Sequence, residues 1–251
     1  MKTNITSLMP ARLFLSIPAV LVAILFGTTP NESLARFSII EFAEAELFLE
    51  ENTTDGDLGI HFKVDGEPWD RIMLFDRFWR RLVDLRVRGS SGVIGLTELF
   101  NESAEPSFDE LPREEFLALF PEGFYYFFGR TIEGDWLFAV AELEHEMVPP
   151  SVIISPAAGS EVDPTEPLLI EWELAESEVE VAGIEVVLEG TDDEVDARML
   201  TAEVLAEDTS LIVPAGFLTP GTTYKVEILV EAENGNKTIS ESEEELTTTD
   251  T

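Results

Sequence analysis

Residues 218–235 read LTPGTTYKVEILVEAENG, and this stretch decides the fold of the C-terminal part of the chain. After the turn residues Pro220 and Gly221, apolar and polar residues alternate strictly as far as Ala232. Such alternation is typical of a β-strand with one buried face. The side chains expected to point inward are Tyr224, Val226, Ile228, Val230 and Ala232.

Similar short runs precede this strand, separated by Gly, Pro and Asp residues. They cover residues 152–154, 168–174, 184–188, 199–205 and 210–213. Several short strands with regularly spaced turn residues indicate an antiparallel β-sandwich.

The quoted stretch resembles the fibronectin type III family, whose corresponding strand follows the pattern L-x-P-x-x-x-Y-x-V-x-V-x-A-x-N. Leu218 and Tyr224 stand at the spacing of a tyrosine corner, and Trp172 matches the core tryptophan of the family's early L-x-W strand. The resemblance implies a sandwich in which the tyrosine hydroxyl bonds to backbone upstream. It also implies a spacer or binding platform without a catalytic centre. Ile184 departs from the family, which usually has an aromatic residue there, so an unrelated immunoglobulin-like sandwich stays an alternative.

The composition changes at Pro149-Pro150, which predicts two domains, residues 36–148 and residues 149–251. The second segment has three cationic residues against 25 acidic ones, whereas the first holds most of the aromatic residues. A Pro-Pro pair favours a stiff, extended connector between such units.

Residues 36–148 match no family and predict a β-rich domain with one short helix. The helix is expected at residues 112–120, where Pro112 precedes acidic residues and then an apolar face. Asp65-Gly66 predicts a turn, and Gly134 predicts the loop of a hairpin. The strands are expected at residues 59–66, 72–75, 82–87, 124–132 and 136–145.

Residues 1–35 are expected to be a secretory signal peptide. A basic start with Lys2 and Arg12 precedes an uncharged apolar run at residues 13–26, and Ser33 and Ala35 then supply small residues at the −3 and −1 positions of a cleavage site. A run of this length is short for a membrane span, so an uncleaved anchor is the alternative. The chain has no Cys and therefore no disulfides, and the product is expected to be secreted or periplasmic.

The formal charge of −36 excludes several classes of partner. Phosphate backbones and anionic membranes repel such a polyanion, so neither nucleic acid binding nor stable membrane insertion after signal cleavage is expected. The hydrophobic content of 45% supplies enough apolar side chains for folded domains. An extracellular protein or a polysaccharide is the expected partner.

One short segment opposes this charge, because five arginines lie within residues 77–88 beside Phe78 and Trp79. Aromatic and guanidinium groups together favour binding of sugars or of sulfated or carboxylated ligands. The alternative is that the outward arginines pair with nearby acids. The candidate ligand-binding residues are Trp79, Arg80, Arg81, Arg86 and Arg88.

Two acidic loops offer oxygen ligands for Ca²⁺, although neither has the spacing of an EF-hand. Solvated acidic loops are the alternative, and no other cofactor is expected. His61 is expected on the polar, exposed face of its strand beside Lys63, and zinc motif spacing is absent. The candidate calcium ligands are Asp55, Asp57, Asp192, Asp193 and Asp196.

The sequence therefore predicts a secreted, non-enzymatic protein with an interaction or structural role. A carbohydrate-binding accessory module is the first alternative, and a carboxylate-based hydrolase is the second. The sequence has no Cys, and it has no G-x-S-x-G motif, which would indicate a nucleophilic serine.

The charge also predicts that salt stabilises the fold. Like charges repel over a Debye length that falls from ~8 Å at physiological ionic strength to ~3 Å at 1 M. The melting temperature is therefore expected to rise as NaCl is increased from low to molar concentration. A flat or falling melting temperature over that range contradicts the prediction.

Overall fold

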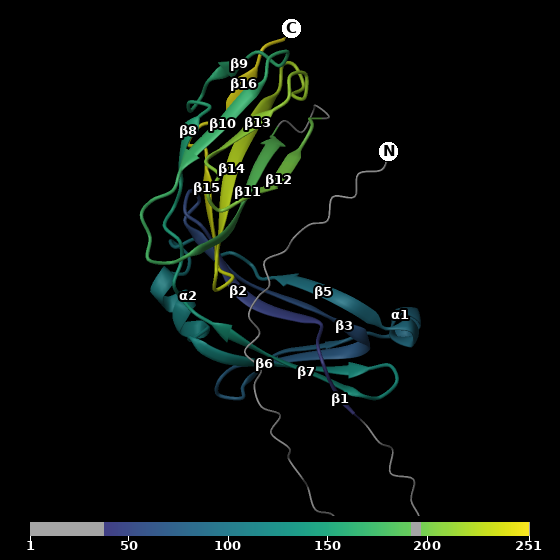
Figure 1. The fold of residues 1–251 in the computed structure, drawn as a ribbon. Helices are drawn as coiled ribbons and strands as arrows, with labels where there is room; N and C mark the ends of the chain where they lie inside the picture. Colours follow the sequence, from purple (N-terminus) through teal and green to yellow (C-terminus); the bar gives the residue numbers. More distant parts are fainter. Residues whose placement is uncertain (1–37, 192–196, 251) are drawn as a thin grey trace, which may run out of the picture. The chain divides into compact units, whose positions relative to one another are not determined.

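A computed structural model of the chain describes residues 38–191 and 197–250. This part consists of sixteen strands and two short helices, which confirms the prediction of a mainly β fold (Figure 1). The expected signal peptide, residues 1–35, lies outside the described residues. Within the described ranges, no helix is long and apolar enough to cross a membrane.

The C-terminal sandwich packs two antiparallel sheets against each other. One has the strand order β13-β10-β8 and the other the order β15-β14-β11-β12. Short parallel pairing of β16 with β9 extends the second sheet. The bounds are β8 Val152–Ser155, β9 Glu161–Val162, β10 Leu168–Glu173, β11 Val181–Gly190, β12 Leu200–Val204, β13 Ser210–Val213, β14 Thr223–Ala232, β15 Lys237–Glu241 and β16 Leu246–Thr248.

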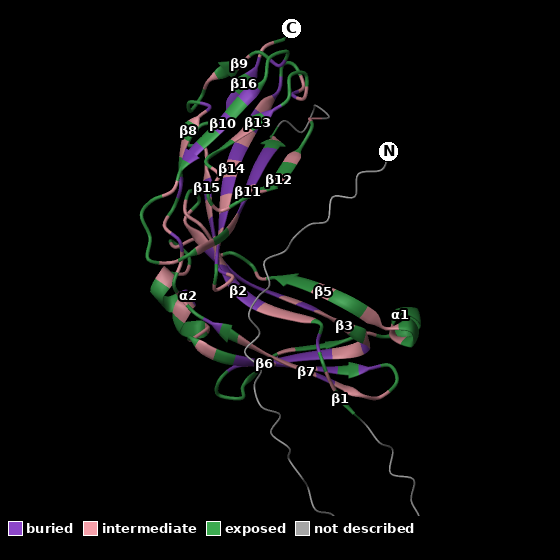
Figure 2. Cartoon of the chain, viewed as in Figure 1, coloured by how far each residue is buried: buried purple, intermediate pink, exposed green. Residues whose placement is uncertain are grey.

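The alternation along β14 places its side chains as predicted. Its five inward residues, Tyr224 to Ala232, are fully buried, and the residues between them are half-buried (Figure 2). Trp172 on β10 is buried against this face in the same hydrophobic cluster.

The tyrosine corner is present. The backbone N–H of Thr219 donates to the hydroxyl oxygen of Tyr224 over 2.9 Å, and Leu218 is buried beside it. This hydrogen bond holds the turn that leads into β14.

The N-terminal sheet is built around β3, which runs for 19 residues from Asp57 to Phe75. The first half of β3 pairs with β2 and β5, and the second half pairs with β4 and β6 (Figure 1). The bounds of the other elements are β1 Ile39–Glu41, β2 Glu44–Asn52, β4 Arg81–Arg86, α1 Gly89–Ile94, β5 Leu96–Glu102, α2 Arg113–Leu119, β6 Gly123–Thr131 and β7 Trp136–Leu143.

The turn predicted at Asp65-Gly66 is wrong, because β3 continues through both residues. Gly66 serves close packing instead: a Cβ there would lie 3.2 Å from the ring of Phe42. The pairing with β5 shifts register between Asp65 and Trp69, which is where β3 changes partners.

The helix after Pro112 and the hairpin of β6 and β7 are confirmed. Gly134 adopts φ 97° in the hairpin loop, a conformation that favours glycine. The prediction of a single helix is wrong, because α1 is a second one. Its sequence, GSSGVI, carries two glycines and buries no residue, so neither propensity nor an apolar face marks it.

The sheet of the N-terminal part continues into the sandwich through parallel pairing of β2 with β15. Asn236 stabilises this junction: its side-chain oxygen accepts from the N–H of Leu49, and its amide donates to the carbonyl oxygens of Glu144 and Glu146, each over 2.9 Å. The two hydrophobic clusters remain separate, one within residues 42–147 and one within residues 148–246. The domain boundary at Pro149-Pro150 stays a prediction.

Replacing Tyr224 by Phe tests the tyrosine corner. The change leaves the Thr219 N–H without its acceptor, so we expect a loss of about 1–3 kcal/mol in unfolding free energy. The melting temperature of a fold of about 200 residues falls by about 2–4 °C for each kcal/mol of lost stability, so thermal melting detects the change.

Tyr126→Phe is the matched control, since it removes the same atom from a half-buried tyrosine of β6. We expect its stability to stay within about 0.5 kcal/mol of the parent. Equal melting temperatures for Tyr224→Phe and the parent would contradict the structural role of the corner.

Candidate functional site

The turn between β3 and β4 is held by Asp76, whose side chain is 1% exposed. One carboxylate oxygen accepts the N–H groups of Phe78 and Arg80, each over 2.8 Å. The other oxygen accepts from Nε of Arg80. Burial alone would raise the pKa of Asp76, but these hydrogen bonds outweigh it and the pKa lies below its ordinary value.

Trp79 closes this turn, since its N–H donates to the carbonyl oxygen of Asp76 over 2.9 Å, and it has φ 62°, a conformation that non-glycine residues rarely adopt. Its indole stacks on the ring of Tyr126, with centroids 4.5 Å apart and planes inclined by 6°. The residue is nevertheless 60% exposed. Since Tyr126 covers one face of the indole, the exposed area includes the other face.

The stacked pair lies on a sheet face rich in aromatic residues. The registers place Phe75 beside Tyr126, and Phe128 beside Phe138. Rings of Phe75 and Phe128 meet edge to face at 5.7 Å, and those of Phe128 and Phe138 lie 5.2 Å apart. We call this half-buried surface the aromatic face, composed of Phe75, Trp79, Tyr126, Phe128 and Phe138.

Three of the five predicted ligand residues have acidic partners next to this face. Arg80 pairs with Asp76, while Arg81 and Arg86 lie 2.9 Å and 3.8 Å from Asp84. Asp84 also receives two hydrogen bonds from Arg71, which lower its pKa. Three guanidinium groups therefore share a single carboxylate.

Arg88 does not join this group, because it is the N-cap residue of α1 beyond the end of β4. No sequence motif singles out Arg71 or most of the aromatic face. The run FYYFF at residues 124–128 was the available signal, since consecutive aromatic residues on a strand place rings on both faces.

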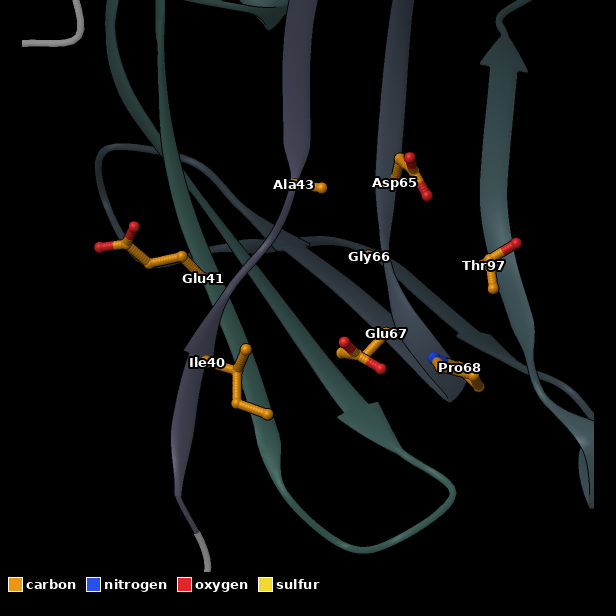
Figure 3. A pocket seen from close by; sticks show the side chains of 8 residues that line it. All are labelled: Ile40, Glu41, Ala43, Asp65, Gly66, Glu67, Pro68 and Thr97. Atoms are coloured by element: carbon orange, nitrogen blue, oxygen red, sulfur yellow. The ribbon is translucent and has the colours of Figure 1, made fainter.

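A surface hollow of about 340 Å³ lies beside β1 and β3 (Figure 3). Three carboxylates line it, from Glu41, Asp65 and Glu67. Figure 3 shows these side chains pointing in different directions.

The expectation that His61 is exposed is wrong, since it is 2% exposed. Its ring stacks on Phe48 at 5.3 Å and lies 5.7 Å from the ring of Phe100. Nε2 of His61 lies 3.2 Å from a carboxylate oxygen of Glu105. Burial lowers the pKa of His61, and burial raises the pKa of both Glu50 and Glu105.

Of the groups of three His or acidic side chains in the described residues, one has its ligand atoms within 4.8 Å of one another: Glu50, His61 and Glu105. Sequence spacing does not reveal it, because the three residues come from separate segments.

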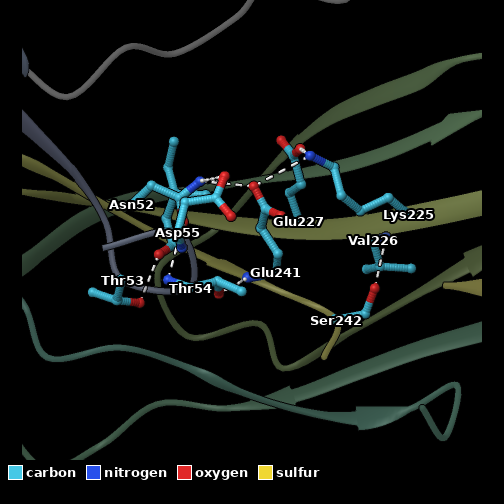
Figure 4. Close-up of polar contacts among 10 residues, drawn as sticks. Asn52, Thr53, Thr54, Asp55, Lys225, Val226, Glu227, Glu241 and Ser242 are labelled. Atoms are coloured by element: carbon cyan, nitrogen blue, oxygen red, sulfur yellow. Dashed lines mark hydrogen bonds and ion pairs between the residues drawn. The ribbon is translucent and has the colours of Figure 1, made fainter. Parts of the chain in front are cut away.

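The predicted calcium ligands lie elsewhere. Asp55 lies in the turn after β2, where the amide of Asn52 donates to it over 3.4 Å and to Glu241 over 2.7 Å (Figure 4). Asp57 begins β3. Asp192, Asp193 and Asp196 lie outside the described residues. Calcium binding at either loop stays a prediction.

Asp76→Asn tests the turn that presents Trp79. The amide keeps an acceptor oxygen but loses the charge that faces Arg80, so we expect a loss of about 1–2 kcal/mol near pH 7. Because the folded-state pKa lies below the unfolded value of about 3.9, the parent's advantage is present above that pH and lost as pH falls through the folded-state pKa.

Urea unfolding at pH 7 and at about pH 3 measures both effects, and Asp109→Asn, at an exposed acid, is the control. If Asp76→Asn and the parent unfold alike at pH 7, the carboxylate does not hold the turn.

No known protein family matches the sequence, and no curated protein matches it. Solved structures similar to the chain include the fibronectin(III)-like modules of Clostridium thermocellum CbhA, at 13% identity and a TM-score of 0.32, covering 41% of this chain and 98% of that chain. The FN1-FN3 domains of chicken CNTN1 match at 14% identity and a TM-score of 0.35, covering 84% and 65%. A two-domain fibronectin type III segment of chicken tenascin matches at 10% identity and a TM-score of 0.25, covering 75% and 90%.

The strands and the buried side chains of the C-terminal part define its fold. A three-stranded and a four-stranded antiparallel sheet enclose Trp172, and Tyr224 forms the corner with Thr219. The C-terminal part of the chain is therefore a fibronectin type III-like β-sandwich.

Proposed function

We propose that the chain is a secreted, non-enzymatic binding module that binds carbohydrate on its aromatic face. The observation that carries the proposal is Trp79, an exposed indole at the end of the turn after β3, stacked on Tyr126. The indole exposes apolar area to water, and the backbone of Trp79 has an unfavourable φ. Both features occur often at binding sites.

The chemistry of the face suits a sugar ring. The free side of the indole offers a flat apolar surface, and Phe78, the preceding residue, is also 60% exposed. The guanidinium groups of Arg77 and Arg80 each lie 5.4 Å from the Phe78 ring centre. Stacking surfaces with polar groups at their edge are typical of sites that fix an amphipathic ligand.

The arginines favour an acidic sugar over a neutral one. Arg81 and Arg86 are more than half exposed although both face Asp84. Their donors are free to bind a carboxylate or sulfate group in addition to Asp84. In a chain of charge −36, these arginines offer an anionic ligand a positively charged contact.

Secretion is supported by the apolar run after Lys2 and Arg12. A sandwich of fibronectin type III type suits a spacer beside the binding surface. The diverging carboxylates of the surface hollow favour binding over hydrolysis.

Affinity gel electrophoresis of Trp79→Ala tests the proposal. Polygalacturonate and heparin serve as acidic probes and hydroxyethyl cellulose as the neutral one. We expect the parent to be retarded by at least one acidic probe and Trp79→Ala to bind at least tenfold more weakly, which corresponds to about 1.4 kcal/mol. Arg86→Ala should weaken binding to acidic probes alone.

Phe100→Ala is the matched control, because Phe100 is a 53% exposed aromatic residue on β5, outside the aromatic face. It should be retarded like the parent. Equal retardation of Trp79→Ala and the parent, or migration of the parent unaffected by all three probes, would refute carbohydrate binding on this face.

A further inference from the structure

A second site forms near the start of β3, on the face where His61 lies. The register of β2 and β3 places Glu50 opposite Gly59 and Phe48 opposite His61. On the other edge of β3, Glu102 of β5 lies opposite His61. Side chains two residues apart on a strand share a face, so Glu50 and His61 point to the same side of the sheet.

Gly59 allows these groups to come together. A Cβ on Gly59 would lie 2.6 Å from a carboxylate oxygen of Glu105 and 2.8 Å from Nε2 of His61. Any other residue would push the carboxylate and the imidazole away. The φ of Gly59 is not in the region that favours glycine, so close approach of Glu105 and His61 is the physical reason for glycine here.

Negative charge exceeds positive charge around His61. Glu50, Glu102 and Glu105 repel one another, and Lys237 contributes one ammonium group. That ammonium lies 4.9 Å from the ring centre of Phe48. A divalent cation would balance the difference.

The protonation state and the ring orientation of His61 suit metal binding. Its burial favours the neutral imidazole, and packing between Phe48 and Phe100 fixes the ring with Nε2 toward Glu105. Nδ1 is buried without a hydrogen-bond partner among the described residues. A metal-bound histidine usually gives this second nitrogen a partner, so the affinity is expected to be about 10–100-fold below that of a site with such a partner.

We propose that Glu50, His61 and Glu105 bind a divalent transition metal ion, and that Zn²⁺ is a suitable occupant. One nitrogen and two carboxylate oxygens, with water in the fourth position, match the ligands that zinc accepts. An imidazole ligand favours zinc over Ca²⁺, which distinguishes this site from the calcium loops.

The spacing of the ligand atoms suits zinc. The three atoms lie within 4.8 Å of one another, and Nε2 of His61 lies 3.2 Å from a carboxylate oxygen of Glu105, close to the ~3.4 Å between ligands bound to tetrahedral zinc at ~2.0–2.2 Å. Glu105 follows the end of β5, and its side chain is 32% exposed. Of the two side chains in this contact, Glu105 is therefore the one that solvent reaches.

Calorimetric titration of the EDTA-treated, dialysed chain with ZnCl₂ tests the site, together with thermal melting. We expect one zinc per chain. At a free zinc concentration about 100-fold above Kd, the melting temperature should rise by about 5–10 °C. Glu105→Gln should bind zinc at least tenfold more weakly, and millimolar CaCl₂ should not reproduce the shift.

Glu98→Gln is the matched control, since Glu98 is an exposed glutamate of β5 whose side chain faces Lys63 instead of the site. It should bind zinc like the parent. Because Glu105 is partly exposed, its variant is expected to fold, and its melting curve without metal verifies this. Co²⁺ titration adds a readout, as a tetrahedral site gives an intense visible absorption that Glu105→Gln should lose.

Two results would overturn the proposal. One is zinc binding of equal affinity in Glu105→Gln and the parent, which would place the ion elsewhere on the acidic surface. The other is a parent chain that shows neither heat of binding nor a thermal shift with zinc up to about millimolar concentration.

Discussion

Both sites depend on the backbone pairing of β3. This strand has hydrogen-bonded neighbours on both edges along most of its 19 residues. Its first half brings His61 between β2 and β5, and its last residue, Phe75, leads into the turn at Asp76. Because a strand paired on both edges cannot slide without breaking two ladders, the positions of His61 and Trp79 are fixed together.

The same strand explains why a histidine is buried on a face expected to be polar. Residues 58–62 are all buried, so both faces of β3 are covered there. One face joins the core, with Leu58, Ile60 and Phe62. On the other, the ring of Phe48 covers His61, and the ammonium group of Lys237, on β15 of the sandwich, lies 4.9 Å from the centre of the Phe48 ring. Contact with the sandwich thus closes a face that the N-terminal sheet alone would leave more open.

What the sequence predicted correctly was local. The alternation in β14, the spacing of Leu218 and Tyr224, and the pattern after Pro112 each lie within one segment. Their physical causes, strand pleating and helix initiation, act over a few residues. The sandwich and the helix α2 could therefore be predicted without tertiary information.

The errors concern residues whose role is decided by distant neighbours. Asp65-Gly66 has the composition of a turn, yet Gly66 lies inside β3 because Phe42 packs against it. The polar pattern around His61 was real, but the rings of Phe48 on β2 and Phe100 on β5 pack against the imidazole. For the candidate site, the arginines and Trp79 were predicted as a group, whereas the partner of the indole, Tyr126, lies 47 positions away in sequence and emerges only from the pairing of β3 with β6.

The charged residues of the chain are distributed unevenly along β3. Near the start of the strand, Glu50, Glu102 and Glu105 surround one neutral histidine, so the local field favours a cation. Along the other half of the strand, three arginines share Asp84 beside the aromatic face, so the local field favours an anion. At physiological ionic strength, screening over ~8 Å confines each field to its own end of the strand. A chain with a large negative charge can therefore carry two binding surfaces of opposite preference, provided that a rigid strand keeps them apart.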